Sequence, residues 1–103
     1  MIFKKIVETY ERAGFPDEWK RHHQGGVIGY LPRERLATPS ETHYAISSCE
    51  AMAWNPTVEG TKSEDTILVG SGPIEVLTRS GNWPEITVHL SGQAFPRPAI
   101  LRK

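Results

Sequence analysis

The stretch RHHQGGVIGY, residues 21–30, contains two adjacent histidines followed by three glycines within five residues. Glycine loses much backbone entropy on folding, so a glycine-rich strand implies a close approach of backbone or ligand. The pair His22-His23 beside it could serve proton transfer or metal binding, because imidazole titrates near neutral pH. The alternative is a glycine-rich β-bulge flanked by surface histidines. The local sequence favours neither interpretation over the other.

The residues before this stretch predict an amphipathic helix over 2–13. Its apolar side chains recur at helical spacing, and its charged side chains occupy the opposite face. Gly14 and the following Phe15-Pro16 should end it, because glycine accepts the left-handed conformation of a helix end and proline cannot continue a helix. No second long helix is predicted.

The residues after the glycine stretch predict short strands separated by turn residues. Residues 31–42 contain two prolines and predict a loop, while the proline-rich residues 95–101 predict an extended, docked segment. The expected strands are 43–46, 50–54, 61–69, 74–78 and a half-buried 85–90, with a hairpin tip at 57–60.

The predicted fold class is therefore α+β, with one N-terminal amphipathic helix packed on a mainly antiparallel sheet. We expect a single domain over 1–103, in which residues 80–103 form a C-terminal strand and an extended tail.

Charge and cysteine content exclude several classes of protein. The 103-residue chain has 12 basic and 12 acidic side chains, so its charge favours neither nucleic acid nor a membrane as a partner. Cys49 is the one cysteine, which fits a reducing compartment, and its small neighbours predict a buried, inert thiol. The sequence has no apolar run of about 18 residues and no signal peptide, so we expect a cytoplasmic protein.

Three stretches carry a family resemblance. Gly25-Gly26-Val27-Ile28-Gly29 resembles a Gly-His-x-x-Gly strand, and Ala53-Trp54-Asn55-Pro56 resembles a Val-Glu-Pro-Gly segment. GTKSEDTILV, residues 60–69, resembles a Gly-x-Arg-x-Glu-Asp-Thr-x-x-Val strand. Motifs of these kinds, in this order, are typical of the creatinase/aminopeptidase P/methionine aminopeptidase family of metallopeptidases with the "pita-bread" fold. The resemblance covers residues 2–79 and is strongest to Xaa-Pro aminopeptidase-like members.

This resemblance implies the C-terminal half of a pita-bread catalytic domain, and hence a fragment of a larger one. Its members hold two divalent metals, such as Mn, Co or Zn, with two aspartates, one histidine and two glutamates. The histidine ligand falls here on Gly26 and the first glutamate on Asn55, whereas the second glutamate is retained as Glu64. The resemblance thus implies a degenerate metal site with Glu64 as its remaining ligand. We expect no cofactor for this chain alone and a possible metal in the complete protein.

The same resemblance suggests roles for five side chains. Creatinase works without a metal, so His22 or His23 could act with Glu64 in acid–base catalysis. Asn55 and Arg33 would bind substrate, and Arg33, at the position of a second family histidine, could bind a carboxylate bidentately. Glu64 could instead be an exposed residue paired with Lys62. Asn55 could be a turn residue before proline, and Arg33 part of a solvated loop.

Two functions follow as hypotheses. The first is the C-terminal portion of a hydrolase of Xaa-Pro aminopeptidase or creatinase type, inactive alone, acting on a peptide or small amide. The second is a non-catalytic binding or assembly module derived from the same fold. In either case, an exposed half-sheet predicts a homo-oligomer.

Overall fold

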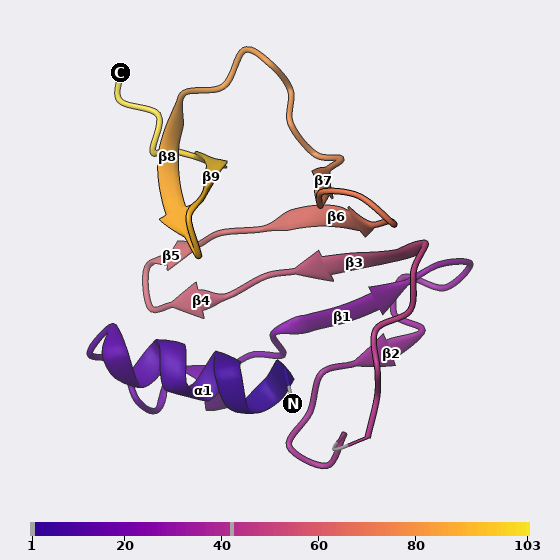
Figure 1. The fold of residues 1–103 in the computed structure, drawn as a ribbon. Helices are drawn as coiled ribbons and strands as arrows, with labels where there is room; N and C mark the ends of the chain where they lie inside the picture. Colours follow the sequence, from indigo (N-terminus) through magenta and orange to yellow (C-terminus); the bar gives the residue numbers. More distant parts are fainter. Residues whose placement is uncertain (1, 42) are drawn as a thin grey trace.

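The N-terminal helix α1 spans Ile2–Arg12 and lies along the lower side of the sheet in the computed structural model, which describes residues 2–41 and 43–103 (Figure 1). Its end is a Schellman motif. The N–H of Gly14 donates to the carbonyl of Glu11, and the N–H of Phe15 donates to that of Tyr10, both at 3.0 Å. Gly14 has φ +86°, the left-handed conformation expected for this position.

A short 3₁₀ turn, η1 (Glu18–Lys20), follows the helix and leads to the histidines. Within the described residues no helix is long and apolar enough to cross a membrane.

The main sheet has five antiparallel strands in the order β2-β1-β3-β6-β7. The central strands β1, β3 and β6 are joined in a register that pairs Gly25 with Trp54 and Trp54 with Asp65. The strand bounds are β1 Gly25–Ile28, β2 Arg35–Leu36, β3 Glu50–Trp54, β6 Asp65–Val69 and β7 Glu75–Val76.

Two hairpin ribbons extend from this sheet. The first joins β4 (Thr57–Val58) to β5 (Thr61–Lys62) through the turn Glu59-Gly60, as the sequence predicts. The second joins β8 (Glu85–Leu90) to β9 (Gln93–Pro98). In Figure 1 the second ribbon stands above the sheet, at the end where β5 leads into β6.

The two glycines of β1 lie where neighbouring backbones come closest. A Cβ atom added to Gly25 would lie 2.0 Å from the carbonyl oxygen of Ala53, and one added to Gly26 would lie 2.0 Å from that of Arg35. Any side chain at either position would therefore push β1 away from a neighbouring strand. The close approach implied by the sequence is between backbones.

A small apolar core and a polar network connect the helix to the sheet. Tyr10 is buried, and its hydroxyl lies 2.8 Å from Gln24 Oε1 and 2.9 Å from the carbonyl of Thr57, while accepting the N–H of Thr57 at 2.8 Å. Burying a polar group is unfavourable unless it is hydrogen-bonded, so these bonds fix the position of the helix. The buried apolar residues are Phe3, Tyr10, Met52 and Ala53.

The β8–β9 ribbon is attached to the main sheet by a buried carboxylate. Asp65, at the start of β6, is 5 % exposed and binds Arg97 of β9 through its Oδ2 atom. Its Oδ1 atom accepts the hydroxyl of Thr78 at 2.6 Å. Arg97 also donates to the hydroxyl of Ser63 at 2.9 Å. The ribbon thus depends on a few polar contacts more than on apolar burial.

The α+β class, the helix and strand 50–54 are confirmed, but several other expectations are wrong. Residues 43–46 form no strand, and 61–69 is interrupted between β5 and β6. The predicted loop 31–42 contains β2; its residue 42 lies outside the described residues. The predicted strand 74–78 shortens to β7.

Two predictions of burial are also wrong, and one about the tail needs correction. All six residues of β8 are exposed, because no layer of the described structure covers this strand. Cys49 is exposed with φ +67°, because it lies in the turn that enters β3. The proline-rich tail is an edge strand, β9, which fits the rule that proline avoids central strands.

Candidate functional site

Three segments carrying predicted site residues end at the same edge of the main sheet. His22 and His23 precede β1, Asn55 follows β3, and Glu64 precedes β6. The antiparallel register places the start of β1 beside the end of β3 and the end of β3 beside the start of β6. The N–H of Asn55 accordingly donates to the carbonyl of Gln24 at 3.0 Å. Strand pairing alone therefore assembles this part of the site.

The buried amide of Asn55 is the centre of the site. Only 1 % of this residue is exposed. Its Nδ2 atom donates to the carbonyl of His23 at 3.2 Å and lies 3.2 Å from His22 Nδ1. Its Oδ1 atom is buried and has no hydrogen-bond partner within the described residues. An acceptor in this state has a hydrogen bond available for a ligand or a water molecule.

The two imidazole rings stack, with centroids 4.4 Å apart and planes inclined by 29°. His22 Nδ1 lies 2.6 Å from the carbonyl oxygen of His23, which can only accept a hydrogen bond. Because this is the shorter of the two contacts of Nδ1, we assign the proton of neutral His22 to Nδ1, which leaves Nε2 with a free lone pair. The Asn55 amide nitrogen, a donor 3.2 Å from the same atom, then makes no hydrogen bond to it. This tautomer can accept a proton through Nε2.

The surroundings of His23 keep it neutral. Partial burial of the imidazole lowers the pKa of His23, and electrostatic interactions with His22, Arg33 and Lys62 lower it further. The carboxylate of Glu64 acts in the opposite direction. At neutral pH the ring is therefore an unprotonated base, as acid–base catalysis requires.

Glu64 lies in the gap between β5 and β6 and binds a lysine. Its Oε2 atom is 2.6 Å from Lys62 Nζ, and its side chain is 48 % exposed. The hydrogen bond from Lys62 lowers the pKa of Glu64, and the charges of Lys62, Arg33 and His23 lower it further, against a smaller opposing effect of burial. Glu64 is therefore ionised at neutral pH. Glu64 is therefore paired with Lys62, which is one of the two roles considered for it from the sequence. It also lies close enough to His23 for the two side chains to interact electrostatically.

Arg33 lies in the connection between β1 and β2, and its charge acts on both His23 and Glu64. One of its guanidinium nitrogens, Nη1, donates to the carbonyl of Pro32 at 2.7 Å. Its Nε atom is buried without a hydrogen-bond partner within the described residues. Arg33 thus has an unused donor and a positive charge beside the histidine pair.

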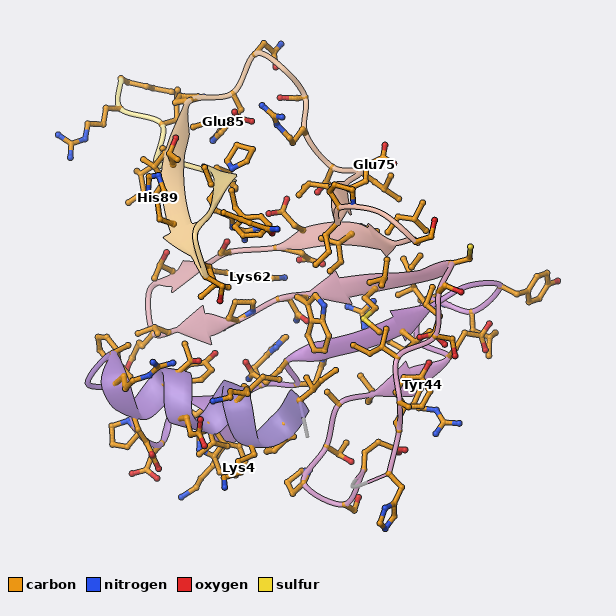
Figure 2. The ribbon with its side chains drawn as sticks, viewed as in Figure 1. Lys4, Tyr44, Lys62, Glu75, Glu85 and His89 are labelled. Atoms are coloured by element: carbon orange, nitrogen blue, oxygen red, sulfur yellow. The ribbon has the colours of Figure 1, made fainter. Side chains whose placement is uncertain are left out.

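Lys62 and Gln24 also belong to the site. Lys62, labelled on β5 in Figure 2, pairs with Glu64. Gln24 is 2 % exposed, and its Nε2 atom donates to the carbonyl of His22 at 2.6 Å. No role was predicted for Gln24 from the sequence. The residue lies between a histidine pair and a glycine pair, and glycines allow strands to approach closely and enclose a neighbouring polar side chain. That position was the available indication that Gln24 is buried.

Two separate hollows are lined by side chains of the site. His22 and Lys62 line one of about 470 Å³ together with Glu18, Arg21 and Glu59. Glu64 lines another of about 250 Å³, together with residues of β6 and of the ribbon. A small molecule could approach His22 through the first.

The donors present do not fit the two-metal site of the family. No group of three His, Cys, Asp or Glu side chains able to hold a metal occurs in residues 2–41 and 43–103. Gly26 has no side chain and no room for one, and Asn55 offers one neutral amide oxygen where a glutamate would offer a carboxylate. Glu64 is already paired with a cation. No step of a mechanism is therefore derived through a metal.

We call His22, His23, Arg33, Asn55, Lys62 and Glu64 together the "histidine cluster".

Comparisons of this chain with protein-family models, with curated proteins and with solved structures found no match.

Proposed function

We propose that this chain is the C-terminal part of a pita-bread-type hydrolase, of the Xaa-Pro aminopeptidase or creatinase kind, and that the histidine cluster forms its half of the active site. The observation that carries the proposal is the meeting of His22, His23, Asn55 and Glu64 at one sheet edge. The three motifs that resemble the family contribute these residues or adjoin them. In the family, the complete site lies between two similar halves, so this chain alone would be inactive.

The cluster supports acid–base chemistry without a metal. His22 has a free Nε2 lone pair, and the lowered pKa of His23 keeps its ring unprotonated at neutral pH, so each ring offers a nitrogen that can accept a proton from a substrate. Ionised Glu64 would stabilise the imidazolium that forms, through its charge. A divalent Mn, Co or Zn ion would need further donors from the other half of such a fold.

The substrate would be a peptide or a small amide that carries a carboxylate. Arg33 has a positive charge and an unused Nε donor, and a guanidinium binds carboxylates in a planar, bidentate manner. Asn55 Oδ1 would accept an N–H of the same molecule, which would satisfy its missing hydrogen bond.

The second candidate function is a binding or assembly module without catalysis. It is supported by the residues at the former ligand positions, because Gly26 cannot hold a metal and Glu64 is bound to Lys62. Both candidates place ligand binding at the histidine cluster, and they differ in whether the bound molecule is cleaved.

A titration with an Xaa-Pro dipeptide tests the shared site first. We expect alanyl-proline to shift the NMR signals of the His22 and His23 rings, and its C-terminal amide to do so far less. Arg33→Gln should remove this difference, whereas Arg102→Gln, a change in the exposed tail, should preserve it.

Equal shifts with the acid and the amide would contradict the role of Arg33. No shift with either would contradict both candidate functions. Because this half would be inactive alone, release of free proline by a protein that contains both halves of such a fold would favour the hydrolase over the binding module.

A further inference from the structure

The two outer edges of the β8–β9 ribbon differ in their free backbone groups. The N–H of Ala99 donates to the carbonyl of Pro84 at 2.8 Å, just beyond the paired residues. Pro84 and Ala99 are thus a hydrogen-bonded pair. Because hydrogen-bonded and non-hydrogen-bonded pairs alternate along an antiparallel ribbon, the next pair is non-hydrogen-bonded, and so is every second pair after it. In a non-hydrogen-bonded pair the backbone N–H and carbonyl groups point outward from the ribbon. The residues with outward backbone groups are Glu85, Thr87 and His89 on β8, and Ala94, Pro96 and Pro98 on β9.

The edge of β9 is protected and that of β8 is not. Two of the three outward positions of β9 are prolines, which have no N–H to offer another strand. All three outward residues of β8 have an N–H and a carbonyl, and no residue of this strand is buried. Within the described residues β8 pairs with β9 alone. Natural proteins usually protect such an edge with lysine, proline or a bulge, none of which occurs in β8.

The apolar side chains of β8 also lack a cover. Ile86, Val88 and Leu90 alternate along one face and are 55 %, 42 % and 65 % exposed. An isolated two-stranded ribbon is at best marginally stable in water, and adding strands stabilises it. By contrast, the edge strands of the main sheet, β2 and β7, have two residues each and offer little to pair with.

The sequence of β8 is complementary to itself in one antiparallel register. With a two-fold axis through Thr87, the threonines of two copies face each other and Glu85 of each copy faces His89 of the other. Ile86 then faces Val88 on the apolar side. Cross-strand Thr–Thr pairs and β-branched pairs favour association, and a carboxylate that faces an imidazole can accept its N–H. Figure 2 labels Glu85 and His89 towards opposite ends of β8, as this exchange requires.

We propose that β8 is a dimerisation edge whose partner is β8 of a second copy of this chain, paired about Thr87 into a four-stranded sheet. The side chains at this edge suit the pairing, because the hydrogen bond from Arg79 lowers the pKa of Glu85 and keeps its carboxylate ionised, and a carboxylate can accept the ring N–H of His89. The chain has zero formal net charge, so two copies do not repel each other. A six-residue edge covers less than the roughly 800 Å² per partner of a standard interface, so the dimer is reversible. This inference does not depend on the chemistry of the histidine cluster.

Sedimentation velocity over a range of concentrations tests the association. We expect the wild-type chain to shift from monomer to dimer, and Thr87→Lys to remain monomeric because two lysines would face each other across the axis. The matched control is Ala94→Lys, which adds the same charge at an outward position of the β9 edge and should still dimerise. A wild-type chain that stays monomeric at its highest soluble concentration, or a Thr87→Lys variant that dimerises like wild type, would overturn the proposal.

Disulfide trapping in a Cys49→Ser background tests the register. Facing residues of a hydrogen-bonded pair have Cα atoms about 5.5 Å apart, within the range of about 4.4–6.8 Å that a disulfide spans. Thr87→Cys should therefore cross-link under mild oxidation. Val88→Cys should not, because each Val88 faces Ile86 of the other copy. Cross-linking through position 88 and not position 87 would overturn the register.

Discussion

Replacing Arg97 by methionine should detach the β8–β9 ribbon from the main sheet. The change keeps a long apolar side chain but removes the cation that pairs with Asp65, whose side chain is 8 % exposed. A buried carboxylate left without its partner is strongly unfavourable, and breaking such a pair typically costs about 3–5 kcal/mol.

The expected loss is smaller here, for two structural reasons. Thr78 still donates to Asp65 Oδ1 at 2.6 Å, and 29 % of the Arg97 side chain is already in contact with water. We therefore expect Arg97→Met to lower the free energy of unfolding by about 2–4 kcal/mol. For a domain of this size that corresponds to a fall in Tm on the order of 10–30 °C.

Urea unfolding and native-state hydrogen exchange would measure the effect. The amides of residues 85–98 should lose protection before those of β3 and β6, because a detached two-stranded ribbon has little stability of its own. Arg79→Gln is the matched control, since it removes an arginine from the bonds of 2.9 and 2.8 Å to exposed Glu85. Combining Asp65→Asn with Arg97→Met should recover part of the loss, because the buried charge is then absent.

An Arg97→Met variant as stable as Arg79→Gln would refute the reasoning. So would an Asp65→Asn/Arg97→Met double variant less stable than Arg97→Met alone, because the penalty would then not come from the unpaired carboxylate.

Three further predictions concern the helix and the histidine stretch. Gly26→Ala should destabilise the fold by about 3 kcal/mol or more, seen in thermal unfolding, since its Cβ would lie 2.0 Å from a backbone oxygen of β2. Tyr10→Phe should cost about 1–3 kcal/mol in urea unfolding, because it leaves Gln24 and Thr57 with unpaired buried groups. His23 has a pKa below its usual 6.5, so the unfolded chain binds the proton more readily and stability falls as pH drops through 6.5. His23→Gln should flatten that part of the pH–stability curve.

Local sequence signals, such as glycine and proline positions, correctly predicted the end of the helix and the bounds of strand β3. The helix ends at Arg12 because the left-handed Gly14 and the following Phe15 complete its hydrogen bonds. Strand 50–54 has the predicted bounds because the Asn55-Pro56 turn follows directly. These features depend on a few neighbouring residues, and the sequence displays them.

Segments whose structure depends on residues far away in the sequence were not predictable from local sequence signals. Tyr44 was expected in a strand, but its ring lies 4.6 Å from the guanidinium of Arg35 and its hydroxyl binds Glu50, so its side chain anchors a loop. Strand β2 exists because the close glycines of β1 allow Arg35–Leu36 to pair with it. The glycines indicate a close approach, but the local sequence does not show which segment makes it, and the contacts of Tyr44 have no local signal.

The candidate site shows the same division. His23, Asn55 and Glu64 approach one another because β1, β3 and β6 are antiparallel neighbours, whereas the sequence indicated only a mainly antiparallel sheet without the order of its strands. The pairing of Glu64 with Lys62 could only be offered as one of two alternatives, because an exposed side chain has several accessible rotamers. Whether Asn55 Oδ1 and Arg33 Nε have hydrogen-bond partners depends on the packing around them, which the local sequence does not display.

The crowding around Gly26 limits the evolutionary and engineering routes open to this chain. A single codon change that introduced histidine there would have to displace a neighbouring strand before it could add an imidazole. A histidine at this position is therefore incompatible with the present pairing of β1 and β2. A designer who wanted a metal centre here would have to build it from side chains at the open end of the sheet, where His22, His23 and Glu64 already converge.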